Sequence, residues 1–180
     1  MNSILEHRKW CIEQHANTNH MYDNYLPYEF HLRMVDSVAQ RYIHLIPDVL
    51  SPTGYPLKTA CLNAVWGHDL IEDARKSYND IKNVLGTSAA DIIYAVTNEK
   101  GKNREERAND TYYKGIRETP GAVFVKLCDR IANVQYSKMT SDKMFMLYKK
   151  ENPHFIESLG YSDSYLIEMF DELNLNFQVK

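Results

Sequence analysis

Several residue types and patterns are scarce in this chain, and each scarcity excludes a class of protein. The 180 residues include three cysteines, an odd number without C-x-x-C spacing, so neither a disulfide framework nor a thiolate zinc site is expected. No apolar run approaches the roughly 20 residues that cross a bilayer, and the N-terminus lacks the apolar core of a secretion signal. We therefore expect a soluble, cytoplasmic protein that spans no membrane and keeps its cysteines reduced.

Charge of a single sign is also lacking, because 21 basic side chains nearly balance 24 acidic ones and the net charge is −3. Such a chain has no global attraction for nucleic acid, which we do not expect as a partner. Strand-like alternation, repeats and linkers are absent too, whereas apolar residues recur at helical spacing. We expect residues 1–180 to form one all-α domain, a helical bundle, and nothing in the sequence indicates its oligomeric state.

The chain does contain an almost wholly apolar stretch that runs into charged residues. Residues 60–67 have Asn63 as their only polar side chain, and four ionisable residues follow within six positions: His68, Asp69, Glu72 and Asp73. We expect a single helix over residues 58–73, in which all four side chains share one flank. Carboxylates gathered at the end of a buried helix are unfavourable unless a cation compensates, so the pattern favours a metal ion.

A second apolar helix, expected over residues 122–136, carries Asp129 and Asn133 one turn apart. An ionised carboxylate among such neighbours should be paired, bound to a metal or neutralised. The competing interpretation is a salt bridge from Asp129 to Lys126 or Arg130 on a half-exposed helix. On this pattern alone, the two interpretations have about equal weight.

His31 is the histidine best placed to complete a site. It falls on the apolar stripe formed with Val35, Val38 and Tyr42, so it should point inward from the first turn of its helix. A lone inward histidine is usually a core residue, but here it accompanies a second histidine and two buried acids. Two imidazoles and two carboxylates form a mixed nitrogen and oxygen set that suits Mn²⁺, Fe²⁺ or Zn²⁺.

Three motifs carry a family resemblance. The chain reads PYxxH at residues 27–31, HDxxED at residues 68–73 and VKLxDRxxN at residues 125–133. In this combination it resembles the HD-domain hydrolases, and more closely the alarmone hydrolases of the RelA/SpoT type with their small stand-alone forms, including the metazoan ones. The resemblance covers residues 15–159 and implies that the all-α bundle is a single HD domain.

The resemblance also implies roles for individual residues. One Mn²⁺, or Zn²⁺ or Fe²⁺ in its place, would be held by His31, His68, Asp69 and Asp129. Glu72 and Asp73 would orient and activate the attacking water, and Asn133 would contact the substrate ribose. The chemistry suits the residues, because a divalent ion acidifies a bound water and a nearby carboxylate can accept its proton. The alternative for the two acids is a merely solvated helix face.

Substrate contacts are expected from the basic run at residues 100–107. The family has basic residues facing the pyrophosphate in the corresponding region, which implies this role for Lys102, Arg104 and Arg107. The alternative is that both arginines pair with neighbouring acids on a solvated helix. Tyr148 stands where the family has a substrate-contacting tyrosine, with a place in the core as the alternative.

One departure from the family concerns the base. Relatives that cleave guanosine tetraphosphate usually carry an Arg-Lys pair before PYxxH, and here Met21 and Tyr22 stand nearest. Tyr22 can stack on a base but supplies no cationic contact, so we expect weaker discrimination between guanine and adenine.

The resemblance implies hydrolysis of the 3′-pyrophosphate of an alarmone nucleotide, a small-molecule substrate, to pyrophosphate and a 3′-hydroxyl nucleotide. Two alternatives stay open. One is an HD nucleotidase or phosphodiesterase that acts on another nucleotide or on a pyrophosphorylated RNA end. The other is a non-catalytic HD module that binds a nucleotide or a protein partner.

Overall fold

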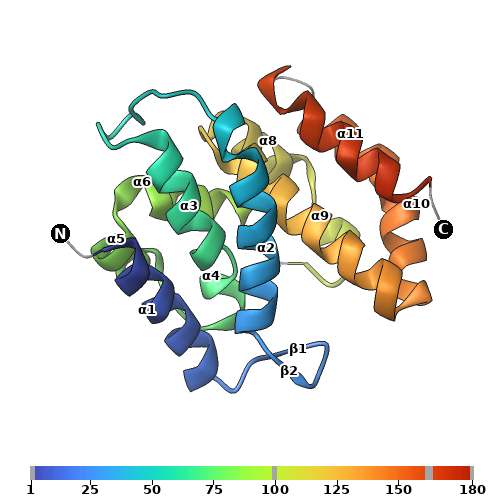
Figure 1. Ribbon diagram of the computed structural model, residues 1–180, viewed down its shortest axis with the longest axis horizontal. Coiled ribbons are helices and arrows are strands. Elements are labelled where there is room, and N and C mark those ends of the chain that lie inside the picture. The colour runs from blue at the N-terminus through green and yellow to red at the C-terminus, as the bar shows by residue number, and fades with distance from the viewer. Residues whose placement is uncertain (1–2, 99–100, 161–163, 179–180) are drawn as a thin grey trace.

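The computed structural model describes residues 3–98, 101–160 and 164–178, which form a bundle of helices with one short antiparallel hairpin (Figure 1). The expected all-α fold is confirmed. The elements are, in chain order, α1 (Ile4–Asn17), β1 (Met21–Tyr22), β2 (Leu26–Pro27), α2 (Glu29–Tyr42), η1 (Ile43–Leu45), α3 (Leu57–Gly67), α4 (Leu70–Asp73), α5 (Tyr78–Leu85), α6 (Thr87–Val96), α7 (Arg104–Arg107), α8 (Asp110–Glu118), α9 (Ala122–Thr140), α10 (Asp142–Leu159), η2 (Ser164–Leu166) and α11 (Ile167–Asn176).

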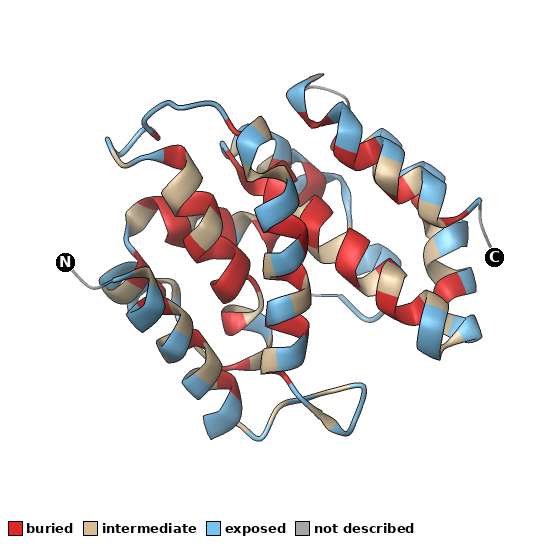
Figure 2. Ribbon diagram, in the orientation of Figure 1, coloured by how far each residue is buried: buried red, intermediate tan, exposed pale blue. Residues whose placement is uncertain are grey.

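Helix α3 lies at the centre of the bundle and packs against α1, α2, α6 and α9 (Figure 1). Most of its residues are buried, and Figure 2 shows this helix mostly in red. A glycine at its end permits the close packing, because a Cβ added at Gly67 would lie 2.6 Å from Ile93 Cδ1 and 2.9 Å from Leu85 Cδ1. The end of α3, where the ionisable residues begin, is therefore held tightly against α5 and α6.

The expectation of one helix over residues 58–73 was wrong, because α3 ends at Gly67 and α4 begins at Leu70. Asp69 lies between them with φ −102° and ψ 4°, away from helical values. A competing hydrogen bond explains the break, since His68 Nδ1 donates to the Val65 carbonyl oxygen at 2.8 Å. In a continuous helix that carbonyl would accept the N–H of Asp69.

The structure also bears on the expectations for the cysteines and for membrane-spanning helices. The three cysteines Cys11, Cys61 and Cys128 are buried and free, as expected of reduced core thiols. Within the described residues, no helix combines the length and apolar character needed to cross a membrane.

Candidate metal and hydrolase site

Two histidines and an aspartate converge inside the bundle. His31 comes from the first turn of α2, while His68 and Asp69 lie between α3 and α4. His31 Nε2 lies 3.1 Å from His68 Nε2 and 3.5 Å from Asp69 Oδ2, and His68 Nε2 lies 2.9 Å from Asp69 Oδ2. Both imidazoles are buried. The three ligand atoms lie close enough together for one metal ion to bind all of them.

Asp129 reaches the same cluster from α9. Its Oδ1 lies 3.5 Å from His31 Nε2 and 3.7 Å from His68 Nε2. Its other oxygen, Oδ2, lies 3.3 Å from Lys126 Nζ, which is the salt bridge considered as the alternative in the sequence analysis. The two interpretations are compatible, because each uses a different oxygen of one carboxylate.

The backbone fixes the orientation of one imidazole. A carbonyl oxygen can only accept, so the bond from His68 to Val65 places the proton on Nδ1 and leaves Nε2 as the ligand atom of the neutral ring. His31 differs, because its Nδ1 is buried and has no hydrogen-bond partner within the described residues. His68 is therefore the more strongly oriented of the two rings.

The charges in the cluster depend on one another. Burial alone would lower the pKa of His68, but Asp69 and Asp129 raise it to about 9. Burial also opposes ionisation of both aspartates, yet His68 and His31 hold the pKa of Asp69 below its ordinary value, and Lys126 and His31 do the same for Asp129. The carboxylates thus require positive charge where the imidazole nitrogens meet, and a divalent cation fits this donor set.

The two acids of α4 have different partners. Glu72 accepts hydrogen bonds from the backbone N–H of Asn98 at 2.6 Å and from its side-chain amide at 3.1 Å. Asp73 Oδ2 lies 3.4 Å from the Tyr28 hydroxyl, which also donates to Asp69. Burial, together with the charges of Asp69 and Glu72, raises the pKa of Asp73 to about 7. Asp73 is therefore the acid that Tyr28 links to the cluster, and it can exchange a proton near neutral pH.

His15 and His20 both lie against the ring of Tyr28, and no sequence pattern had pointed to either. The ring centroids lie 4.3 Å from Tyr28 for His15 and 4.1 Å for His20, and both pairs are stacked. His20 Nδ1 lies 3.9 Å from Asp73 Oδ2, so an imidazole stands beside the expected catalytic acid. The hairpin of β1 and β2 separates these histidines from α2, so helical periodicity could not relate them to His31.

Two proteins of known name are similar to this chain in sequence. A Danio rerio protein named guanosine-3′,5′-bis(diphosphate) 3′-pyrophosphohydrolase MESH1 is 26% identical over 132 residues, which are 73% of this chain and 67% of the relative. A Drosophila melanogaster protein of the same name is 25% identical over 90 residues, 50% of each chain. The chain thus resembles these two proteins, both named as ppGpp 3′-pyrophosphohydrolases, in sequence.

The fold similarity extends over nearly the whole length. A solved structure of a metazoan ortholog of SpoT, described as hydrolysing ppGpp and playing a role in starvation responses, has a TM-score of 0.66 and 19% identity, covering 96% of this chain and 95% of that one. No family model matches the sequence. The similarity to the two named proteins confirms the predicted resemblance to the alarmone hydrolases, and the similarity to the solved structure confirms the all-α bundle.

Asn133 and Tyr22 contact each other beside the cluster. Tyr22 Oη donates to Asn133 Oδ1 at 2.9 Å, while Asn133 Nδ2 donates to the Asp129 carbonyl oxygen at 3.1 Å. The Tyr22 ring stacks on His31, with centroids 4.8 Å apart and planes at 13°. The structure thus brings both residues to the cluster, but one face of Tyr22 already covers the His31 ring.

Arg104 is engaged by Glu151, which lies outside its own segment. Its guanidinium donates twice to Glu151 of α10, at 2.9 and 3.1 Å, and Arg130 donates to the same carboxylate at 3.0 Å. The two guanidinium groups lie 5.6 and 4.9 Å from the centroid of the Tyr148 ring. The acidic partner of Arg104 therefore comes from a distant helix rather than from its own segment.

Lys102 and Arg107 are exposed, and their hydrogen bonds stay within their own segment. The backbone N–H of Lys102 donates to the Glu106 carboxylate at 2.8 Å, and Arg107 Nε donates to the Asn103 carbonyl oxygen at 3.3 Å. Lys100, the other lysine of the basic run, lies outside the described residues. A phosphate-binding role for this run stays a prediction.

Proposed function

We propose that the protein hydrolyses the 3′-pyrophosphate of a ppGpp-type nucleotide, releasing pyrophosphate and a 3′-hydroxyl nucleotide. The observation that carries the proposal is the cluster of His31, His68 and Asp69, to which Asp129 adds an oxygen within 3.7 Å of both imidazoles. Tyr28 links Asp73 to this cluster. The names of the two curated relatives support the substrate class.

The four side chains would hold one divalent ion, of which Mn²⁺ is our choice and Zn²⁺ or Fe²⁺ the alternatives. Imidazole nitrogens and carboxylate oxygens without a thiolate suit these ions. When bound, such an ion lowers the pKa of a coordinated water and polarises a phosphoryl oxygen. The bond from His68 to Val65 keeps one nitrogen ligand oriented before any ion arrives.

Asp73 is the proposed proton acceptor. Its side chain is 34% exposed, so a water can reach it, and its pKa of about 7 lets it take the proton from the attacking water. The water oxygen then forms the new bond to phosphorus, and the proton passes to the ribose 3′ oxygen as the bond between that oxygen and phosphorus breaks. Glu72, which Asn98 holds through two hydrogen bonds, would orient the water.

The substrate contacts that we propose are Asn133 to the ribose, Lys102, Arg104 and Arg107 to the pyrophosphate, and Tyr148 and Tyr22 to the nucleoside. Arg104 could take this role only by exchanging its two bonds to Glu151 for bonds to phosphate oxygens. A guanidinium fork matches the geometry of both carboxylate and phosphate, so such an exchange is chemically reasonable.

The proposal is tested by incubating the protein, loaded with Mn²⁺, with guanosine and adenosine 3′-pyrophosphates and with ordinary nucleotides. We expect pyrophosphate and a 3′-hydroxyl nucleotide as the products, identified by chromatography and phosphorus NMR. Orthophosphate from ordinary nucleotides would instead indicate a nucleotidase. Absence of turnover with Mn²⁺, Zn²⁺ and Fe²⁺ would favour a non-catalytic binding module.

A further inference from the structure

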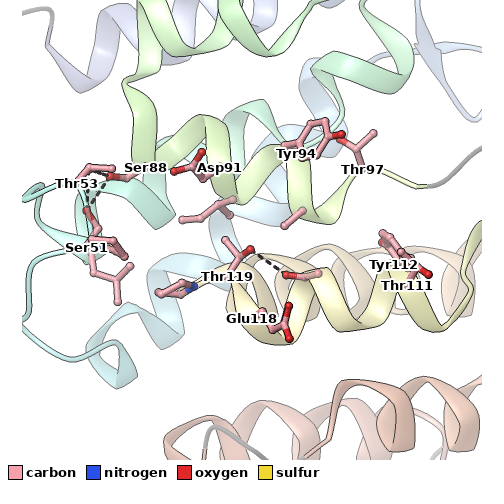
Figure 3. Close-up of a pocket in the computed structure, with 16 residues that line it drawn as sticks. Ser51, Thr53, Ser88, Asp91, Tyr94, Thr97, Thr111, Tyr112, Glu118 and Thr119 are labelled. Carbon is pink, nitrogen blue, oxygen red and sulfur yellow. Dashed lines mark hydrogen bonds between the residues drawn. The ribbon is translucent and has the colours of Figure 1, made fainter.

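A cavity of about 500 Å³ lies between α6, α8 and the loop before α3 (Figure 3). This volume falls within the roughly 300–1,000 Å³ typical of small-molecule sites. Its described lining includes none of the four proposed metal ligands and neither of the proposed catalytic acids. The cavity is therefore separate from the hydrolase site.

The charged side chains in the described lining are two acids, Asp91 and Glu118, and the lining includes no lysine, arginine or histidine. They come from different walls, Asp91 from α6 and Glu118 from α8 (Figure 3). Tyr78 donates to Asp91 Oδ1 at 2.7 Å, which leaves Oδ2 as an acceptor. Lys114 Nζ lies 3.8 Å from Glu118 Oε1 and both side chains are exposed, so a ligand ammonium would compete with Lys114 for this carboxylate. The cavity is thus unfavourable for phosphate groups and favourable for cations.

Hydrogen-bond acceptors accompany these acids. Ser51 Oγ lies 2.7 Å from Ser88 Oγ and 3.1 Å from Thr53 Oγ1, so three hydroxyl groups meet at one end of the cavity (Figure 3). The hydroxyls of Thr97 and Thr119 donate to carbonyl oxygens of their own helices at 2.8 and 2.9 Å. Each hydroxyl oxygen that has donated its hydrogen retains lone pairs that can accept from an N–H group.

The remaining lining suits hydrocarbon. Leu57, Ile92 and Pro120 contribute apolar surface, and the rings of Tyr94 and Tyr112 add aromatic surface that can also attract a cation. Anionic groups on two walls, together with this apolar surface, complement a chain of methylene groups that carries ammonium groups.

We propose that this cavity binds a diamine or polyamine, with its ammonium groups at Asp91 and Glu118 and its methylene groups against the apolar lining. This inference does not depend on the proposed hydrolase function, because it uses a separate set of side chains.

Two residues of the cavity lining neighbour residues that contact the hydrolase site. Tyr112 lines the cavity, and its ring lies 5.8 Å from Lys126 Nζ, the partner of the proposed metal ligand Asp129. Thr97 also lines the cavity, and the next residue, Asn98, holds Glu72. We therefore expect a molecule bound in the cavity to alter the surroundings of both Glu72 and Asp129.

Calorimetric titration with putrescine and with spermidine, at near-physiological ionic strength, tests the site. We expect a dissociation constant below about 1 mM for at least one amine, weakened at least about 5-fold by Asp91→Asn and by Glu118→Gln. The amide oxygen in Asp91→Asn can still accept from Tyr78, so the fold should persist, and circular dichroism checks this. Glu13→Gln is the matched control, because it removes one negative charge from an exposed position on α1.

Failure of both amines to bind would overturn the proposal. Binding that all three variants weaken equally would overturn it too, because it would reflect net charge rather than the cavity. Amide NMR spectra of the metal-free protein test whether the cavity communicates with the hydrolase site. Addition of the amine should shift the Asn98 and Asp129 signals in the wild type and not in the Asp91→Asn, Glu118→Gln double variant. Shifts confined to the cavity lining would exclude communication with the hydrolase site.

Discussion

Lys126 and Asp129, one turn apart on α9, form an ion pair in which Nζ lies 3.3 Å from Oδ2. The pair leaves Oδ1 of the same carboxylate 3.5 Å from His31 Nε2. Burial alone would lower the pKa of Lys126, but Tyr112 and Asp129 raise it, so the ammonium stays charged. A carboxylate fixed in this way presents one oxygen in one orientation, which favours binding of an ion through that single oxygen.

The metal site is tested by removing one ligand. His31→Ala should weaken Mn²⁺ binding by more than about 10²-fold, because changes to residues that merely support a ligand already weaken binding by about 10–100-fold. Calorimetric titration of metal-free protein measures the affinity. His44→Ala is the control, since His44 is exposed in η1, after α2. Equal affinity in the His31 variant and the wild type would remove His31 from the ligand set.

The two acids of α4 are tested by substitutions that preserve their shape. Asp73→Asn and Glu72→Gln should keep the fold and bind Mn²⁺ but lower kcat by about 10²-fold or more, the usual contribution of a positioned acid–base group. Glu13→Gln serves again as a control for the loss of one negative charge. Steady-state kinetics and metal titration should be run on the same preparations. Turnover at the wild-type rate in both variants would show that these acids are merely solvated side chains on a helix face.

Asp73 should also affect how the stability of the metal-free protein depends on pH. Folding raises its pKa from 3.8 to about 7, through burial and the charges of Asp69 and Glu72. The folded state therefore binds more protons than the unfolded state between about pH 4 and pH 7, so the contribution of this group to stability falls as pH rises through that window. Asp73→Asn should lack this fall. Its melting temperature relative to the wild type should then be higher at about pH 8 than at about pH 4, and a difference that is constant with pH would contradict the assignment.

Substitutions of Arg104 and of Glu151 should have opposite effects on the KM for the substrate. Hydrogen bonds to charged groups contribute about 1.5–3 kcal/mol, so Arg104→Gln should raise KM by roughly 10-fold or more with a smaller effect on kcat. Glu151→Gln should lower KM, because it removes the carboxylate that competes with phosphate for Arg104. Arg41→Gln is a matched control, since Arg41 pairs with Glu172 of α11 in a similar ion pair. If the Arg104 and Glu151 variants raise KM equally, their ion pair only supports the local structure.

Sequence patterns singled out the residues of the cluster because each lies on an apolar helix or at its end, where a polar side chain is conspicuous. The break between α3 and α4 was not predictable in this way, since it depends on the hydrogen bond from His68 to Val65 that replaces a helical one. The partner of Arg104 was also missed, because Glu151 is 47 residues away and no local spacing relates the two. Local periodicity identified the inward-facing residues, and contacts between distant segments decided which of them meet.

The last prediction concerns the base. The expected cationic pair is absent, and the Tyr22 ring is stacked on His31 with its hydroxyl bonded to Asn133, so this tyrosine has little freedom to read a base edge. Sites that do not hydrogen-bond the distinguishing groups of a substrate discriminate weakly. We therefore expect kcat/KM for matched guanosine and adenosine 3′-pyrophosphates to differ by less than about 10²-fold, which corresponds to about 2.7 kcal/mol. Tyr22→Phe keeps the stacked ring and loses the bond to Asn133, so it should lower kcat/KM for both substrates by a similar factor. A guanine preference above that limit, or one that Tyr22→Phe abolishes, would show that this segment reads the base after all.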